Sequence, residues 1–419
     1  MSPTMPSLLP PLLGRAFPPD GLRRAEQEAI VRLQKVLDAE IAPLAAENDA
    51  RGRYPSEAIA ALKRTGILAA AIPEELGGLG FSFRASMESQ IRIAAADSAV
   101  SQIYKIHEEC LREAVLNVPD QFRPALLKAV LAERKILGLA VAEAGRKVDD
   151  PMQTVFTPRS DGGGVISGKK IYTTGAAEAD IIVIWSFDPT TPGVAENPAF
   201  GLRVSLVPAG TSGIAIHRDW NSLGQRATDS GTITFSNLQV EPAWNGQASG
   251  KFPSLHAPLM WQLGFAANLI GNAIGAVKAS APFIRDHSRP WPSSGAENAT
   301  DDPYVRRLMG ELVADLAAAY ALTLAAADLL DAFTRGEIDR TTLAIPIYAA
   351  KSAASRTAVR ATNDIFALMG TRSATNALGL DRFWRNARTV SLHDPVEWKH
   401  AEIGHHVLTG WEPPWGVYQ

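Results

Sequence analysis

Apolar residues recur every three or four positions along the first third of the chain, which is the spacing of one face of an α-helix. Between residues 21 and 48 the apolar positions are Ile30, Leu33, Leu37, Ile41 and Leu44. The same spacing returns at 56–67, 84–117 and 119–134, after a glycine-rich turn at 72–80. We therefore predict an N-terminal α domain over residues 21–135, preceded by a loose arm at residues 1–20.

From Ile136 the apolar positions alternate with polar ones, which is typical of half-buried β-strands. The alternating runs are 136–143, 153–158, 164–174, 180–187, 202–208, 213–218 and 230–240. Asp161 followed by three glycines predicts a hairpin turn between the second and third runs. Short strands without intervening helices favour an antiparallel sandwich or barrel over a nicotinamide-binding βαβ unit. We predict a middle antiparallel β domain over residues 136–243.

After Pro242 the spacing is helical again, with long Ala- and Leu-rich segments at 257–287, 303–335 and 341–369. Asp302 and Pro303 combine an N-cap residue with proline at the first helical position, and Gly370 marks the end of the third segment. The pattern predicts a C-terminal four-helix bundle over residues 244–419, so the fold class is α+β. Its surplus of apolar surface predicts burial between subunits.

Composition narrows the function classes. The net charge of −3 argues against nucleic-acid binding, which is typical of proteins with a strongly basic surface. Residues 257–277 carry no charge over a length that could cross a bilayer, but Gln262, Asn268 and Asn272 favour a buried helix, so we predict no membrane association. The single cysteine, Cys110, cannot form an internal disulfide and fits a cytoplasmic location. The start of the chain has no secretory signal, and no residue spacing matches a metal site.

The α–β–α order, the turn at 73–80 (Pro-Glu-Glu-Leu-Gly-Gly-Leu-Gly) and the segment 223–235 together resemble the acyl-CoA dehydrogenase family. Within it, four further segments resemble the flavin-dependent monooxygenase branch typified by dibenzothiophene monooxygenase and the sulfur-acquisition oxidoreductases. These segments are 170–176, 288–304, 383–388 and 393–396.

This resemblance implies a two-component monooxygenase. A separate NAD(P)H-dependent flavin reductase would supply reduced FMN, O2 would add at the flavin C4a carbon, and the hydroperoxide would pass one oxygen atom to a heteroatom of a small apolar or heteroaromatic substrate. Sulfur is the favoured acceptor. One alternative is an FAD-dependent acyl-CoA dehydrogenase that uses Asp394, which stands in place of the family's catalytic glutamate. Another is a catalytically lapsed flavin-fold partner protein.

The resemblance also assigns site residues. His107, His393 and Thr173 would be catalytic, since histidine titrates near neutral pH and a threonine hydroxyl can bond the reactive edge of a flavin. The residues expected to bind the cofactor are Tyr104, Thr173, Thr174, Trp220, Ser230, Arg289, Arg372 and Lys399.

Two of these residues bear on the cofactor and the assembly. Arg372 replaces a small residue of the glycine-rich segment that takes the far half of FAD in dehydrogenases, so it favours FMN and could meet a terminal phosphate. Arg289 resembles an arginine that reaches into the neighbouring subunit's site, which implies a homotetramer. Simpler interpretations remain: Asp394 as the N-cap of the last helix, Thr173 and Thr174 as ordinary strand residues, and His107 as a satisfied core histidine.

Overall fold

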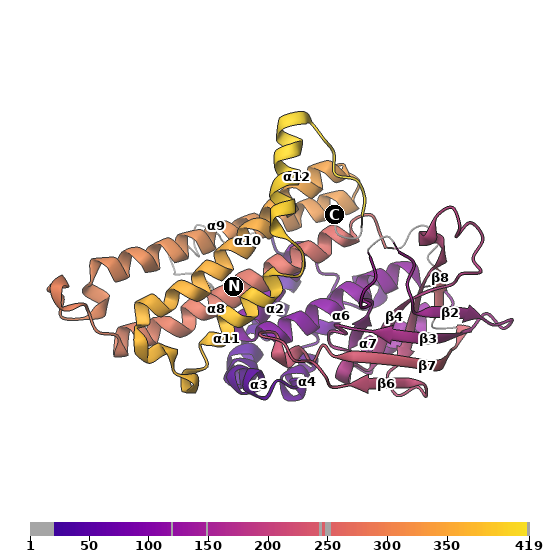
Figure 1. Cartoon of the computed structure of the whole chain (residues 1–419), viewed down its shortest axis with the longest axis horizontal. Helices are drawn as coiled ribbons and strands as arrows, with labels where there is room; N and C mark the ends of the chain where they lie inside the picture. Colours follow the sequence, from indigo (N-terminus) through magenta and orange to yellow (C-terminus); the bar gives the residue numbers. More distant parts are fainter. Residues whose placement is uncertain (1–20, 119, 148–149, 243–244, 248–252, 417–419) are drawn as a thin grey trace.

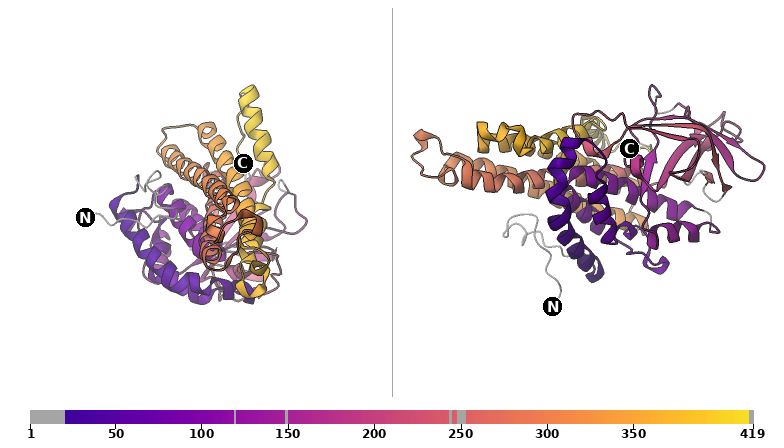
Figure 2. Two further views of the ribbon diagram at one scale, coloured as in Figure 1. Left: turned by 90° about the vertical axis from the view of Figure 1, so that its left-hand side faces the viewer. Right: turned by 90° about the horizontal axis from the view of Figure 1, so that it is seen from below.

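The structure is a computed structural model that describes residues 21–118, 120–147, 150–242, 245–247 and 253–416. Helices come first, a sheet follows, and long helices end the chain (Figure 1). The sheet lies at one end of the elongated molecule, and the long helices extend from it to the other end (Figure 2). This order agrees with the predicted α+β architecture. The predicted arm lies outside the described residues, and the predicted domain boundaries stay predictions.

Six α-helices form the described N-terminal part. They are α2 (Arg24–Val36), α3 (Ala45–Arg51), α4 (Ser56–Arg64), α5 (Phe83–Ala96) and α6 (Ser98–Asn117), with α7 (Arg123–Leu131) leading to the sheet. The predicted helix over 84–117 is two helices, because Asp97 has extended backbone angles and its carboxylate caps α6 by accepting from the N–H groups of Ala99 and Val100. Turns of π- and 3₁₀-helix join α2 to α3.

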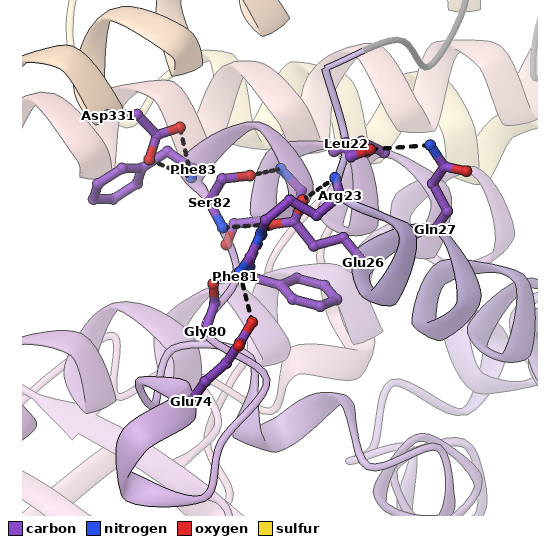
Figure 3. A network of polar contacts seen from close by, with 12 residues as sticks. Leu22, Arg23, Glu26, Gln27, Glu74, Gly80, Phe81, Ser82, Phe83 and Asp331 are labelled. Carbon is purple, nitrogen blue, oxygen red and sulfur yellow. Dashed lines mark hydrogen bonds and ion pairs between the residues drawn. The ribbon is translucent and has the colours of Figure 1, made fainter.

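The start of α5 is tied to two other helices by carboxylates that accept backbone N–H groups (Figure 3). Glu26 on α2 accepts from the N–H of Ser82 at 2.8 Å, and Asp331 on α9 (Pro303–Thr334) accepts from the N–H of Phe83 at 3.0 Å. Arg23 pairs with Glu26 at 3.0 Å and also bonds the glycine-rich turn. These bonds fix the direction in which α5 enters the helical core.

The sheet contains every predicted strand: β1 (Leu137–Ala140), β2 (Val155–Pro158), β3 (Gly164–Lys170), β4 (Ile181–Phe187), β5 (Leu202–Pro208), β6 (Ile214–His217) and β7 (Thr232–Val240). A short β8 (Asn245–Gln247), which was not predicted, pairs with β5. The strand order is β6-β7-β3-β2-β4-β5-β8, and β1 pairs with β4. That last pair is parallel, because the chain crosses over through the β2–β3 hairpin before β4, and β2 also meets β4 in parallel at one pair. The sheet is therefore mixed and not purely antiparallel.

The C-terminal part contains α8 (Ala257–His287), α9, α10 (Arg340–Met369), α11 (Asp381–Ser391) and α12 (Val396–Thr409). The predicted helix signals are confirmed: Asp302 accepts from the N–H of Tyr304 at 2.9 Å, and Gly370 ends α10 at a φ of 71°. The long helices α8, α9 and α10 pack together, and α5 from the N-terminal part packs against α8 and α9 as a fourth helix. In contrast, α12 packs on α10 and projects from this bundle (Figure 1).

Among the described residues, one helix, α9, is long and apolar enough to cross a membrane by length and composition, and half of its most apolar window is buried in the protein. The segment weighed from the sequence, residues 257–277, lies in α8. Its amides are buried there, and two of them make hydrogen bonds within the protein: Asn268 donates to the Ser98 carbonyl at 2.9 Å, and Asn272 donates to the Phe383 carbonyl at 2.7 Å. These bonds account for polar residues in an otherwise apolar helix.

Candidate active site

His393 and Asp394 lie in the turn between α11 and α12. The prediction that Asp394 caps the last helix is wrong, since α12 begins after Pro395 without a side-chain cap. Instead, Asp394 Oδ1 accepts from Lys351 Nζ on α10 at 3.2 Å and lies 3.4 Å from His393 Nδ1. The physical reason is that the ammonium of Lys351 is wholly buried, and a buried charge requires a countercharge.

Further polar side chains gather with this pair around the ring of Phe265 on α8. The His393 ring lies 4.0 Å from the Phe265 ring, centre to centre, and the Nζ atoms of Lys105 and Lys351 lie 3.8 Å and 4.5 Å from its centre. Lys105 pairs with Glu109 on α6 at 2.8 Å. We call these six residues the Phe265 cluster: Lys105, Glu109, Phe265, Lys351, His393 and Asp394.

The Phe265 cluster brings together four segments of the chain, so sequence reasoning found only its His393–Asp394 part. A signal for the rest does exist in the sequence. Lys105 and Glu109 are four residues apart and therefore share one face of their helix, and Lys351 interrupts an alanine-rich helix. Charged residues at positions that helical spacing assigns to the core indicate a buried polar site.

Burial shifts the proton equilibria of the Phe265 cluster. It raises the pKa of Glu109 to about 7 despite the opposing charge of Lys105, and it lowers the pKa of Lys351 to about 8 despite Asp394. The side chain of His393 is 43% exposed, but desolvation by the groups packed around its ring still lowers its pKa, and the hydrogen bond that its ring makes to Asp394 opposes this shift. For Asp394 burial acts upward, but the hydrogen bond with His393 and the charge of Lys351 outweigh it and hold its pKa below the usual range. Several groups near one ring can therefore exchange protons close to neutral pH.

Four of the predicted cofactor residues meet where β3 ends beside the segment 220–231. Thr173 donates its hydroxyl to the Gly231 carbonyl at 2.8 Å, and Ser230 donates to Thr174 Oγ1 at 3.0 Å. Trp220 donates its indole N–H to the Gln225 carbonyl of the same segment at 2.9 Å. We call Thr173, Thr174, Trp220 and Ser230 the strand-end group. Thr174 and Trp220 are half-buried, while Thr173 and Ser230 are buried.

His107 and Tyr104 lie in the interior on α6. His107 is completely buried: its Nδ1 accepts from the N–H of Leu137, the first residue of β1, at 3.0 Å, and its Nε2 lies 2.9 Å from the Leu68 carbonyl. Burial lowers its pKa to about 4, so the ring is neutral. Both ring nitrogens are occupied by backbone groups, which favours the interpretation as a satisfied core histidine. Tyr104 is also fully buried, and its hydroxyl has no hydrogen-bond partner within the described part of the chain.

The two arginines that we predicted to contact a phosphate do not lie near the strand-end group. Arg372 donates to the His287 carbonyl at the end of α8, in a shallow groove that Asp286 also lines. Arg289 is exposed two residues beyond α8. In Figure 1 this end of α8 lies at the end of the molecule opposite the sheet. Within one chain, Arg289 and Arg372 are therefore remote from the strand-end group. Lys399 is buried at the start of α12, where it bonds Glu402 at 3.2 Å and lies 4.2 Å from the centre of the Tyr348 ring.

Comparison with known proteins identifies the class. The chain belongs to the acyl-CoA dehydrogenase family: the models of its N-terminal, middle and C-terminal domains match residues 24–134, 138–238 and 263–398. The resemblance predicted from the sequence is therefore confirmed.

The particular relatives fall in the monooxygenase branch of the family. The chain is 32% identical to the probable FMNH2-dependent monooxygenase SfnC of Pseudomonas putida, over 92% of this chain and 96% of that protein. It is 32% identical to the dibenzothiophene monooxygenase of Rhodococcus qingshengii, over 88% of this chain and 90% of the relative. The crystal structure of FMN-bound TdsC from Paenibacillus sp. A11-2 matches with a TM-score of 0.87 at 30% identity, over 94% of this chain and 100% of that one.

Proposed function

We propose that the chain is a two-component, FMN-dependent monooxygenase that transfers one oxygen atom of O2 to a heteroatom, foremost sulfur, of a small aromatic or apolar substrate. The relatives named above support the enzyme class and the cofactor. The observation on this chain that carries the proposal is the state of Asp394. Its carboxylate is buried, paired with Lys351 and more acidic than usual, so it is a poor base for removing the α-proton of an acyl-CoA. This argues against the dehydrogenase alternative.

The strand-end group, together with Tyr172, fits the ring system of FMN. Tyr172 adopts a left-handed φ of 55° and is 63% exposed, and its ring meets that of Trp220 edge to face at 6.0 Å. A residue other than glycine in this conformation is strained, and such strain is concentrated at binding sites. The two aromatic rings would hold a flat ring, while Thr174 and Ser230 would offer hydroxyls to its polar edge. FMN, when bound and reduced, would supply the chemistry that activates O2.

We assign proton transfer to His393. Its Nδ1 is directed to Asp394, and its ring packs on Phe265, which leaves Nε2 as the atom that can hold or deliver a proton toward a bound substrate. Thr173 has its hydroxyl bound to the Gly231 carbonyl, so we assign it the positioning of the strand end beside the flavin. The geometry of His107 supports no direct role for that residue.

A partner protein and a location complete the proposal. The chain would receive reduced FMN from a separate NAD(P)H-dependent flavin reductase. We propose a cytoplasmic location, supported by the single cysteine of the chain.

The test of the function is a reconstitution. The purified chain is supplied with FMN, a flavin reductase, NADH and ¹⁸O₂, together with a panel of thioethers, sulfones and aromatic amines, and products are analysed by mass spectrometry. A product that gains one ¹⁸O atom supports the proposal. Copurification of FAD with oxidation of an acyl-CoA supports the dehydrogenase alternative, and failure to bind either flavin supports the lapsed partner protein.

We expect Arg372→Ala to weaken FMN binding by about 2 kcal/mol, or about 30-fold in Kd, the scale of a lost charged hydrogen bond. The reason is that Arg372, which lies at the exposed end of α8, would contact the terminal phosphate of FMN bound to a second copy of the chain. Fluorescence titration with FMN and FAD measures the effect. Arg335→Ala is the matched control, since Arg335 is an exposed arginine paired with Glu337. Tighter binding of FAD than of FMN by the unaltered protein would contradict this assignment.

We also expect a homotetramer, because large apolar side chains are exposed at the end of the bundle and on α12. Trp291 and Tyr304 are each 74% exposed, and Leu408 is 84% exposed. Exposed apolar surface of this kind is typical of protein contacts. Sedimentation equilibrium gives the mass directly, and a monomer with full FMN affinity would count against both the tetramer and the shared site.

A further inference from the structure

We propose that Lys351 is a positioning residue for His393: by holding Asp394 as a carboxylate, it fixes which ring nitrogen of His393 carries the proton. This inference rests on the proposed function, in which His393 manages the proton. It assigns a role to Lys351, which lies 43 residues before Asp394 and on a different helix.

The geometry places one carboxylate oxygen between the two other groups. Asp394 Oδ1 lies 3.2 Å from Lys351 Nζ and 3.4 Å from His393 Nδ1. Asp394 Oδ2 is buried and has no hydrogen-bond partner among the described residues. Since Oδ1 serves both neighbours, the ammonium of Lys351 and the imidazole of His393 are coupled through a single atom.

Stability alone does not account for a lysine at this position. Lys351 is completely buried in an alanine-rich part of α10, and removing an ammonium from water costs several kcal/mol. Replacing a buried ion pair by apolar residues of similar volume is often neutral or stabilising. The charge does, however, help to keep Asp394 ionised, in addition to the hydrogen bond between Asp394 and His393. An ionised carboxylate can only accept hydrogen bonds, so His393 Nδ1 must carry the proton that faces it.

The direction of the electrostatic effect on His393 can be worked out from the groups that face it. Lys351 on α10 and Lys105 on α6 are positive and disfavour the protonated imidazole, whereas Asp394 is negative and favours it. Glu109 pairs with Lys105, and α8 contributes the uncharged Phe265. The hydrogen bond with His393 also holds Asp394 as a carboxylate, so Lys351→Met removes a positive charge facing the ring and should raise the pKa of His393, whereas Asp394→Asn should lower it. A role that is only structural gives no reason for shifts of opposite sign.

The test is NMR of the full chain labelled with ¹³C,¹⁵N-histidine, with the His393 signals assigned by their loss in His393→Ala. We expect neutral His393 to carry its proton on Nδ1. We expect the ring pKa to rise by about one unit in Lys351→Met, to fall by about one unit in Asp394→Asn, and to return toward the original value in Lys351→Arg. If Lys351→Met does not fold, the fall in Asp394→Asn and the value in Lys351→Arg decide the result.

Lys170→Met is the matched control, because Lys170 is also wholly buried and paired with a carboxylate, Glu143, at 2.7 Å on the sheet. It removes the same charge from a pair that does not face His393, so the His393 titration should stay unchanged. An unchanged titration in both Lys351→Met and Asp394→Asn, or a proton on Nε2 of neutral His393, would overturn the proposal.

A second readout uses turnover. The fraction of reduced FMN that yields product is measured against pH, and the limb set by His393 should move to higher pH in Lys351→Met. In a His393→Ala background, Lys351→Met should cause no further loss, whereas separate losses that multiply would overturn the coupling. Absence of any product from the unaltered chain would instead refute the proposed function. The NMR titration would still decide the role of Lys351, so the two failures are distinguishable.

Discussion

Replacing His393 with alanine is expected to lower the yield of oxygenated product by about 100-fold, while reduced FMN is still consumed and hydrogen peroxide is released instead. The loss is at the lower end of what a positioned proton donor contributes to catalysis. His393 supplies the imidazole of the Phe265 cluster. The neighbouring phenyl ring of Phe265 has no titratable proton, so it cannot take over the role of His393. Flavin binding should persist, because the strand-end group and Tyr172, which we assign to the flavin ring, do not include His393 or its neighbours in the turn between α11 and α12.

The measurement compares reduced FMN consumed, peroxide formed and product formed in the same reaction. His405→Ala is the control, since His405 stacks on Trp411 at 4.8 Å and no role was assigned to it. Unchanged coupling in His393→Ala would remove this residue from the mechanism. A loss of all turnover restricted to Asp394→Asn, with acyl-CoA as substrate, would return the chain to the dehydrogenases.

The structure changes what Asp394→Asn is expected to do in the monooxygenase. As a helix cap, Asp394 could be replaced by asparagine with little effect. In the structure it is the anion shared by Lys351 and His393, so asparagine would leave a buried ammonium without its countercharge. Loss of one partner of a buried pair typically costs 3–5 kcal/mol. We therefore expect Asp394→Asn to be less stable and less well coupled than the original chain.

Much of the fold was predictable because its signals are local. Helical spacing, an N-cap followed by proline at 302–303 and the glycine at 370 each act within a few residues, and the structure has the expected elements there. The parallel pairing of β1 with β4 was not predictable in this way. It depends on the path of the chain through the β2–β3 hairpin, and alternation of apolar residues carries no information on strand direction.

The candidate site was predictable only in part, because its contacts join distant segments. The residues of the strand-end group were predicted from the resemblance, and the structure brings them together. The partner of Asp394 was not, since a local pattern that suits a helix cap cannot reveal a lysine on another helix. The same limit applies to His107, whose two ring nitrogens are occupied by backbone groups of residues 68 and 137. Motif spacing names the residues, but only packing shows which atoms remain available.

The bundle that carries Phe265 depends on glycines of α8, and we expect Gly271→Ala to destabilise the protein by about 3 kcal/mol. A Cβ atom at Gly271 would lie 2.3 Å from the Ile91 carbonyl oxygen and 2.6 Å from the Ala94 Cβ, both on α5. The first of these is a backbone atom in a helix, so it can give way only if α5 and α8 separate. Overpacking of a close-packed core typically costs 1–3 kcal/mol, and here the obstacle cannot adopt another rotamer.

Gly310→Ala is the matched control for this expectation. Gly310 lies in the exposed face of α9, where an added Cβ meets nothing within 4 Å, so the same substitution should stabilise the helix by about 1 kcal/mol. Urea unfolding at a fixed protein concentration, followed by circular dichroism, should therefore give midpoints that move in opposite directions for the two variants. Because Phe265 lies on α8 beside His393, a separation of α5 and α8 in Gly271→Ala should also lower the coupling of reduced FMN to product. A midpoint for Gly271→Ala equal to that of the original protein would show that the two helices pack less closely than the structure has them.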